Sequence, residues 1–238
     1  METVKKKDFV EIKYTGYSNG NVFDSNIDED LKKLDPKGKP RELVVIIGEG
    51  MVVPGLDKAL EGKEIGKEYE VGVSAKEGFG ERKREMVKTI PLKIFTEKQI
   101  NPYPGMVLAM DDSLVRIITI SGARVMTDFN NPLAGKDLVY KFKIVRKIDD
   151  EKERAKILLE FILRFVPEHE VTDKEVIVKG PKILEKFVTA FKEKFKDILG
   201  KELNFVLEEQ KPKKEEEKKE EQKEKAEDKS EKEESEKK

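Results

Sequence analysis

The sequence predicts an α+β protein with more strands than helices. Apolar and polar residues alternate over residues 10–14 and 138–144, and a period of two is typical of strands with one buried face. An Asn-Gly pair, whose residues both tolerate positive φ, follows the first of these segments and favours a tight hairpin. Apolar residues follow helical spacing over residues 150–166 and 182–199. Strands and helices together make the predicted class α+β.

The composition excludes several classes of function. The chain has 238 residues, of which 37% are hydrophobic and 42% charged, so its surface must be densely charged. Its 49 Lys+Arg and 50 Asp+Glu give a net charge of -1, which argues against a general nucleic-acid binder. The absence of Cys excludes a disulfide, a zinc cluster and Cys/His catalysis. Because His169 is the only His, we expect no His-ligated metal site, and we predict no metal and no cofactor.

The same composition favours a cytoplasmic protein. No apolar run approaches the roughly 20 residues that a membrane helix needs. The first residues contain no apolar core of a signal peptide, so we expect neither secretion nor a membrane partner. Abundant Lys and Glu without Cys is typical of a thermophile.

The predicted hairpin at Asn19-Gly20 is the most informative segment. Its strands bring Tyr14 within reach of Phe23 and Asp24. Two aromatic rings and one carboxylate can form an apolar pocket with a single polar anchor, which is a usual form of small binding site. An ordinary half-buried hairpin explains the same pattern.

The rest of the first block is predicted in order. Residues 27–41 are polar and read as a surface loop, and residues 43–47 as a buried strand. Pro54 and Gly62 suit the start and end of a helix of about two turns. A strand at residues 68–74 precedes Gly78-Phe79-Gly80, a flexible turn that carries an exposed ring.

A small β module is predicted between residues 81 and 130. Four short strands are predicted, at residues 87–90, 106–110, 114–120 and 124–129. One helical turn, at residues 91–95, follows the first of them. About fifty residues are near the lower limit for an independent core. The next strand, residues 138–144, is long enough to rejoin the first sheet. The module is therefore predicted to be inserted into the first domain.

A separate αβαβ domain is predicted at residues 150–209. The two helical segments alternate with short strands at residues 175–179 and 203–207. From residue 210 to 238 nearly every residue is Lys, Glu or Asp, so this tail cannot bury apolar area and should be disordered.

Five motifs in order carry a resemblance to a known family. They are Tyr14-Thr15-Gly16, Phe23-Asp24-Ser25, Val52-Val53-Pro54-Gly55-Leu56, Gly78-Phe79-Gly80 and Asn131-Pro132-Leu133-Ala134-Gly135-Lys136. In this order and spacing, residues 1–148 closely resemble the FKBP family of peptidyl-prolyl isomerases. The insertion resembles the insert-in-flap domain of the SlyD branch, and the extra C-terminal unit resembles the long archaeal type.

The resemblance implies a fold and its domains. The fold is the FKBP antiparallel sheet wrapped on a short helix, with an inserted small β domain and a C-terminal αβαβ domain. Residues 1–82 and 131–149 would form the isomerase domain, and residues 83–130 the insert-in-flap domain.

The resemblance also implies the site residues. The pocket for a substrate proline would consist of Tyr14, Phe23, Asp24, Val52, Val53, Leu56, Phe79 and Tyr140, with Leu43 and Met51 completing the rim. Leu56 stands where the family often has Trp, as is common in the SlyD branch. Phe79 replaces a frequent Tyr, and Tyr140 replaces the usual Phe. The tail lacks the metal-binding His residues of the SlyD branch, so the nickel role of that branch is not carried over.

The inserted module is rich in apolar residues. We expect Ile94, Phe95, Ile100, Tyr103 and Met106 to include client-binding side chains, because exposed apolar patches mark interaction sites. Each of them could instead fill the core of the module. By resemblance, the module binds unfolded segments and hands prolines to the pocket.

The predicted function is peptidyl-prolyl cis–trans isomerisation combined with chaperone activity. The partners would be unfolded or partly folded proline-containing polypeptides, with no membrane and no nucleic acid. The alternative is a non-catalytic holdase or scaffold with a vestigial pocket, against which the retained Tyr14, Phe23, Asp24 and Tyr140 argue. A nucleic-acid or ribosome adaptor acting through residues 82–84 is a weaker alternative. The C-terminal unit could form a homodimer or remain a self-contained monomeric domain.

Overall fold

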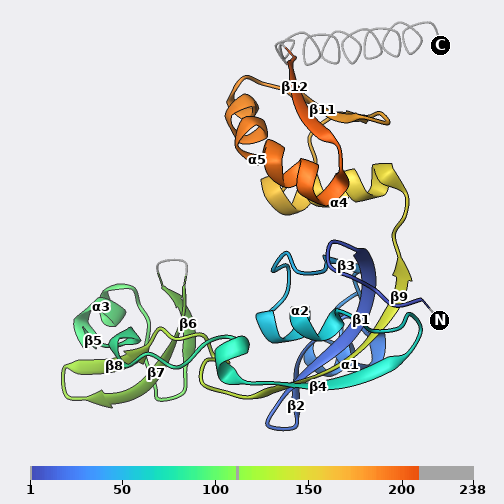
Figure 1. Ribbon diagram of the computed structural model, residues 1–238. Coiled ribbons are helices and arrows are strands. Elements are labelled where there is room, and N and C mark those ends of the chain that lie inside the picture. Colours follow the sequence, from blue (N-terminus) through green and yellow to red (C-terminus); the bar gives the residue numbers. More distant parts are fainter. Residues whose placement is uncertain (1, 111–112, 209–238) are drawn as a thin grey trace, which may run out of the picture. The chain divides into compact units, whose positions relative to one another are not determined.

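The first 148 residues carry two antiparallel sheets, and a third, mixed sheet follows in the second part of the chain (Figure 1). The computed structural model describes residues 2–110 and 113–208. Its two units are Met1–Ile148 and Asp149–Lys238. The predicted disordered tail, residues 210–238, lies outside the described residues. None of the described helices is long and apolar enough to cross a membrane.

The main sheet is built around β1 (Phe9–Ser18). Its order is β2-β1-β9-β4, and β3 also pairs with β1. The partners are β2 (Asn21–Ser25), β3 (Leu43–Ile46), β4 (Glu68–Val73) and β9 (Leu138–Lys147). Alternate residues of β1 and β9, such as Ile12 opposite Ile144, point into one core because side chains of a strand alternate between its faces. The predicted α+β class and its antiparallel main sheet are therefore confirmed.

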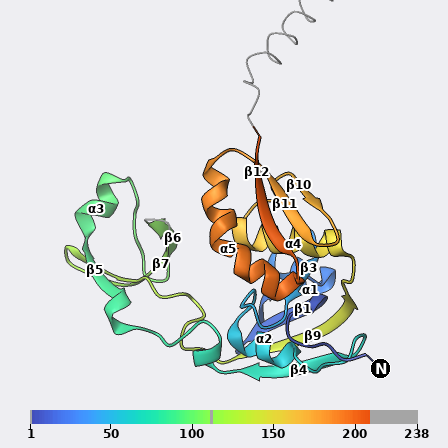
Figure 2. The same ribbon diagram turned by 45° about the horizontal axis from the view of Figure 1, so that its top comes forward.

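The short helix α2 (Pro54–Leu60) lies against this sheet, as Figure 2 shows. Pro54 occupies the first turn, where a missing N–H costs nothing, and Leu56 and Leu60 enter the core. Gly55 lets the helix approach β4, because a Cβ there would lie 2.5 Å from a methyl carbon of Val73.

The predicted surface loop at residues 27–41 contains a helix, α1 (Asp28–Leu34), which corrects that prediction. No residue of α1 is buried, so the sequence has no apolar periodicity that would predict this helix. Acidic residues occupy its first turn and lysines its last, an arrangement that complements the helix dipole. Lys32 also forms an ion pair of 2.5 Å with Asp28 one turn earlier.

A four-stranded sheet lies between β4 and β9 in the chain. Its order is β5-β8-β7-β6, formed by β5 (Val87–Pro91), β6 (Val107–Met110), β7 (Ser113–Ser121) and β8 (Arg124–Asp128). The helix α3 (Leu92–Glu97) covers one face, and its Phe95 meets Ile117 and Val125 in a small core. Two short 3₁₀ turns, η1 (Ala75–Glu77) and η2 (Arg84–Met86), precede β5.

The C-terminal unit contains one strand more than predicted. Its elements are α4 (Glu151–Leu163), β10 (His169–Val171), β11 (Glu175–Gly180), α5 (Ile183–Leu199) and β12 (Glu202–Leu207). The sheet order is β10-β11-β12, with β11 and β12 parallel. β10 has three residues, too few for a visible alternation. α4 ends earlier than predicted, because Arg164 takes a left-handed conformation (φ 66°) and caps it.

A buried lysine ties the elements of this unit together. The Lys201 side chain donates hydrogen bonds of 2.6 and 2.9 Å to the carbonyl oxygens of Thr172 and Asp173. Its ammonium also lies 2.8 Å from a carboxylate oxygen of Glu151 at the start of α4. Lys201 is 4% exposed, and these partners stabilise an ammonium that would otherwise be costly to bury.

Candidate active site

The hairpin of β1 and β2 brings a phenol and a carboxylate together. The hydroxyl of Tyr14 donates a hydrogen bond of 2.6 Å to Oδ2 of Asp24. The predicted turn has positive φ at both central residues, 50° at Asn19 and 78° at Gly20. Asn26 holds the base of the hairpin, since its Oδ1 accepts from the backbone N–H of Tyr14 at 2.8 Å. The orientation of the Tyr14 ring is thus fixed from both ends.

Four aromatic rings meet beside this pair. Phe23 lies at their centre, with edge-to-face contacts to Tyr140 (5.8 Å between ring centroids) and to Phe79 (6.1 Å). Tyr14 and Tyr140 have their centroids 6.3 Å apart. Edge-to-face contacts of this kind are favourable beyond the area they bury. The cluster therefore joins β1, β2, β9 and the turn after η1 into one half-buried apolar surface.

Gly16 makes room for this cluster. It lies opposite Asp24 on β2 and opposite Tyr140 on β9. A Cβ at Gly16 would lie 2.6 Å from the nearest ring carbon of Phe23, so only glycine allows the ring to cover the strand here. Gly16 is part of one of the five motifs, but it was not predicted as a site residue because glycine has no side chain that would indicate a role.

The aliphatic part of the site comes from the start of α2. Leu56 is 2% exposed and belongs to the core beneath the site, and the half-buried Val52 and Val53 pack against the same core. Leu43 and Met51, predicted for the rim, are also half-buried there. The thioether of Met51 accepts a hydrogen bond of 3.2 Å from the backbone N–H of Ile46, which directs this side chain toward β3.

Asp57 fixes the loop that carries Met51 and the two valines. Its carboxylate accepts backbone hydrogen bonds from Gly48 (2.8 Å) and Gly50 (3.0 Å). Both glycines have positive φ, a conformation that favours glycine. Asp57 was not among the predicted site residues, although it positions this loop. An acidic residue in the first turn of a helix that follows a glycine-rich loop was the available signal.

The turn that carries Phe79 is held at both sides. The backbone N–H of Gly80 donates to the carbonyl of Ala75 at 2.8 Å, and the carbonyl of Gly80 accepts from Gly135 at 2.8 Å. Asp137 accepts a hydrogen bond of 3.0 Å from the backbone N–H of Ala75. Segments before and after the inserted sheet therefore hold the Phe79 ring, which is 36% exposed, over Phe23.

The two phenols of the site stay protonated at neutral pH. Burial, the nearby Asp24 carboxylate that accepts its hydrogen bond, and Tyr140 together raise the pKa of Tyr14 well above its usual value. Burial, with a smaller contribution from Asp24, raises the pKa of Tyr140 to about 12. Tyr14 is therefore a hydrogen-bond donor whose proton is already committed to Asp24.

The predicted client-binding residues of the inserted module divide into three groups. Tyr103 and Ile94 are exposed (61% and 38%), while Ile100 and Met106 are half-buried against the small core. Phe95 is 1% exposed and fills that core, which corrects its assignment as a client contact. The helix α3 covers one face of the sheet, and Phe95 is the side chain that this cover buries.

The structure also exposes apolar residues that the sequence analysis did not assign. Val107, Leu114 and Met126 on β6, β7 and β8 are 54%, 59% and 41% exposed. Leu114 and Met126 alternate with the buried Val115 and Val125, and this alternation was the signal that could have identified them. Within residues 2–110 and 113–208, no group of three or more His, Asp or Glu side chains could hold a metal ion.

Comparison with known proteins identifies two families. Residues 1–96 match the FKBP-type peptidyl-prolyl cis-trans isomerase family, and residues 88–133 match the family described as FKBP26, IF domain. A short-type peptidyl-prolyl cis-trans isomerase of Methanocaldococcus jannaschii is 30% identical over 147 residues, which cover 60% of this chain and 94% of that protein. The SlyD isomerase of Helicobacter pylori is 26% identical over 157 residues, which cover 64% of this chain and 79% of that protein.

Replacing Gly16 by Ala should displace the Phe23 ring. The added Cβ cannot share space with a ring carbon 2.6 Å away, so we expect a loss of stability of about 1–3 kcal/mol and a changed ring packing around Tyr140. Chemical denaturation measures the stability, and the NMR shifts of the Tyr140 ring report the packing. Gly72→Ala on β4 is the matched control, because no atom lies within 4 Å of its added Cβ. Equal spectra for the two variants would contradict this account of Gly16.

Proposed function

The chain belongs to the FKBP-type peptidyl-prolyl cis–trans isomerases, and we propose that the aromatic cluster around Phe23 is where X–Pro bonds isomerise. The observation that supports this assignment is the meeting of four rings beside one hydroxyl–carboxylate pair. The proposed site residues are Tyr14, Phe23, Asp24, Val52, Val53, Leu56, Phe79 and Tyr140, with Leu43 and Met51 at the rim. Proline-containing polypeptides are the substrates.

The chemistry requires a surface of low polarity. Rotation about an X–Pro bond breaks no covalent bond, but its barrier is about 20 kcal/mol. At the twisted transition state the amide loses conjugation, so its carbonyl becomes less polar and its nitrogen more basic. An apolar surface therefore binds the twisted form better than the planar one, which lowers the barrier. The rings of Phe23 and Phe79 supply this surface together with Val53, and the buried Tyr140 (4% exposed) and Leu56 (2% exposed) support it from the core.

Asp24 acts at the edge of this surface. Its Oδ2 is occupied by the Tyr14 hydroxyl, which fixes the ring of Tyr14 against that of Tyr140. The carboxylate also places negative charge beside the site, where it favours the more basic nitrogen of the twisted amide. Phe79 has no hydroxyl, so it contributes only apolar area.

Asp24→Ala combined with Tyr140→Ala should lower catalysis. We expect the rate of cis–trans exchange to fall by tenfold or more, because the variant loses the Tyr140 ring and the Asp24 carboxylate. A tenfold loss corresponds to a barrier increase of about 1.4 kcal/mol. A proline-tetrapeptide assay measures the rate, and circular dichroism checks the fold. Val139→Ala, on the opposite face of β9, is the control and should keep the rate. An unchanged rate in the double variant would place the chemistry elsewhere.

We further propose that residues 83–130 form a chaperone module and that residues 1–82 with 131–149 form the isomerase domain. Exposed apolar side chains of the module support this: Ile94 on α3, Tyr103 in the segment that follows α3, and Val107, Leu114 and Met126 on the strands. Large exposed apolar side chains gathered on one small module mark an interaction site. A non-catalytic holdase is less favoured, because the aromatic cluster is intact.

Replacing residues 84–129 by a short turn should separate two activities. Turnover of a proline tetrapeptide should remain within about threefold of the wild-type rate, because the site residues lie outside the deleted segment. A threefold loss corresponds to a barrier increase of about 0.7 kcal/mol. Catalysed refolding of a proline-limited unfolded protein should slow by at least tenfold, and suppression of its aggregation should weaken. Equal losses on both substrates would mean that the module shapes the site and does not dock clients.

The C-terminal unit supports a proposal of self-association. On α5, Phe195 is fully buried while Phe187 is 49% exposed. Ile183 and Leu207 are 70% and 55% exposed. A hydrogen bond of 3.0 Å from Glu208 to Gly180 places the end of β12 beside the start of α5. β12 is also an edge strand, and edges invite pairing with another chain.

Light scattering tests this proposal on the full chain and on a chain ending at Asp149. We expect the full chain to have twice its monomer mass at micromolar concentrations and the shorter chain to be a monomer. Ile183→Lys, which adds charge to the apolar end, should return the full chain to a monomer, while Lys186→Glu on the same helix should not. Two monomers in the first comparison would show that the unit is a self-contained domain.

A further inference from the structure

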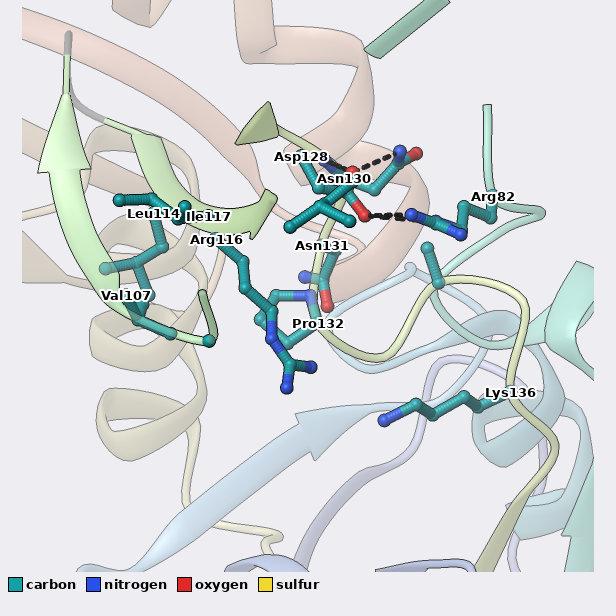
Figure 3. Close-up of a pocket in the computed structure, with 13 residues that line it drawn as sticks. Arg82, Val107, Leu114, Arg116, Ile117, Asp128, Asn130, Asn131, Pro132 and Lys136 are labelled. Atoms are coloured by element: carbon teal, nitrogen blue, oxygen red, sulfur yellow. Dashed lines mark hydrogen bonds and ion pairs between the residues drawn. The ribbon is translucent and has the colours of Figure 1, made fainter. Parts of the chain in front are cut away.

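A cavity of about 460 Å³ lies beside the inserted sheet (Figure 3), and no residue of the aromatic cluster is among those that line it. One wall consists of strand residues, including Val107, Leu114 and Arg116. The other consists of the two segments that connect this sheet to the main sheet, with Arg82 on the first and Lys136 on the second. Neither the isomerase site nor the proposed client contacts account for its three cationic side chains.

Hydrogen bonds hold the connecting segments in place. The guanidinium of Arg82 donates hydrogen bonds of 2.6 and 3.0 Å to Asp128. The side-chain amide of Asn130 donates a hydrogen bond of 2.6 Å to Oδ1 of Asp128. The same amide accepts a hydrogen bond from the backbone N–H of Lys83 and donates one to the carbonyl of Lys83. Burial acts to raise the pKa of Asp128, but these hydrogen bonds and the charge of Arg82 outweigh it and hold the pKa below its usual value. The carboxylate of the cavity wall is therefore ionised and already neutralised by Arg82.

Within the part of the chain that the structure describes, the other two cations have no such partner. Figure 3 shows the side chains of Arg116 and Lys136 directed into the same space. Among the described residues, no carboxylate lies within ion-pair distance of either one. The cavity thus presents two uncompensated positive charges, which favours an anionic ligand.

Apolar side chains stand next to these charges. Val107 lies directly opposite Arg116 in the sheet, and Leu114 is two residues away on the same face of β7. Residues two apart on an extended strand are about 7 Å from each other. Both side chains are more than half exposed. A ligand that matches this surface carries a negative charge and an apolar group within one or two residues of each other.

The connecting segments lead directly into the isomerase site. Lys136 precedes Tyr140 by four residues, and Arg82 follows Phe79 by three. An extended chain spans at most about 3.6 Å per residue, so the Cα of Lys136 lies within about 14 Å of that of Tyr140. A polypeptide held at its proline by the aromatic cluster could therefore reach the cavity with a residue a few positions away.

We propose that this cavity binds an acidic side chain of the client polypeptide, flanked by an apolar residue and located about four residues from the substrate proline. The proposal rests on the proposed function and specifies its substrate class. A nucleic acid fits less well, because the residues that line the cavity include no aromatic ring on which a base could stack. The cavity makes the chain an isomerase with a preference for clients that carry acidic residues near proline.

The test uses the full-length protein and two fluorescent twelve-residue peptides. Both contain one proline and flanking leucines, and they differ in Asp or Asn four positions from the proline. Fluorescence anisotropy measures Kd and the isomerisation assay measures kcat and KM, for the wild-type chain and for Arg116→Gln with Lys136→Gln. The control is Lys93→Gln with Lys98→Gln, which removes the same charge from the region of α3.

We expect the wild-type chain to bind the Asp peptide about tenfold more tightly than the Asn peptide, with the difference in KM and not in kcat. The double variant should lose this preference while binding the Asn peptide as before, and the control should keep it. Unchanged binding of the Asn peptide also shows that the variant is folded. Equal preference in the wild type and the double variant would overturn the proposal. If the wild-type chain isomerises neither peptide, the proposed function itself is wrong.

Discussion

The pairing of β1 with β9 is the interaction on which the first unit depends. It aligns Tyr14 with Phe142 and Gly16 with Tyr140, so the core and the site are built on the same registered pair of strands. The two strands are far apart in the sequence, and the whole inserted sheet lies between them. Loop-closure entropy grows only slowly with loop length, by about 0.6 kcal/mol for each doubling, so an insertion there is tolerated. A one-residue slip would turn every side chain of β9 to the other face and remove Tyr140 from the site.

The place of the insertion explains how one chain can combine two activities. The inserted sheet leaves the main sheet just after Phe79 and returns just before Tyr140, and both residues belong to the aromatic cluster. The hydrogen bond from Gly135 to Gly80 closes the two connecting segments against each other at this point. On the proposed function, a polypeptide bound by the module would be held close to the site, where its effective concentration is high. Tethering of this kind raises the rate on long clients without changing the chemistry at the proline.

Sequence reasoning was successful where a residue type has one physical use. The Asn-Gly pair predicted the hairpin, because both residues accept positive φ, and alternation predicted the long strand β9. It missed α1, which has no buried residue to form an apolar stripe, and β10, which has only three residues. Phe95 and Leu114 show a deeper limit. Both are large and apolar in a small module, and only the position of α3 decides that the first is buried and the second exposed. The role of Gly16 depends on a ring from another strand, so no local pattern could reveal it.

A protein that binds unfolded chains must expose apolar groups without associating through them indiscriminately. Net charge does not provide this protection here, because a charge of -1 gives little general repulsion between copies. Local charges take that role. Leu114 lies two residues from Arg116 on the open face of β7. Charges interspersed among exposed apolar groups oppose pairing with a surface that cannot match them, as they do on natural edge strands. The same charges then select among partners, since a chain that supplies the complementary sign beside an apolar residue keeps both interactions.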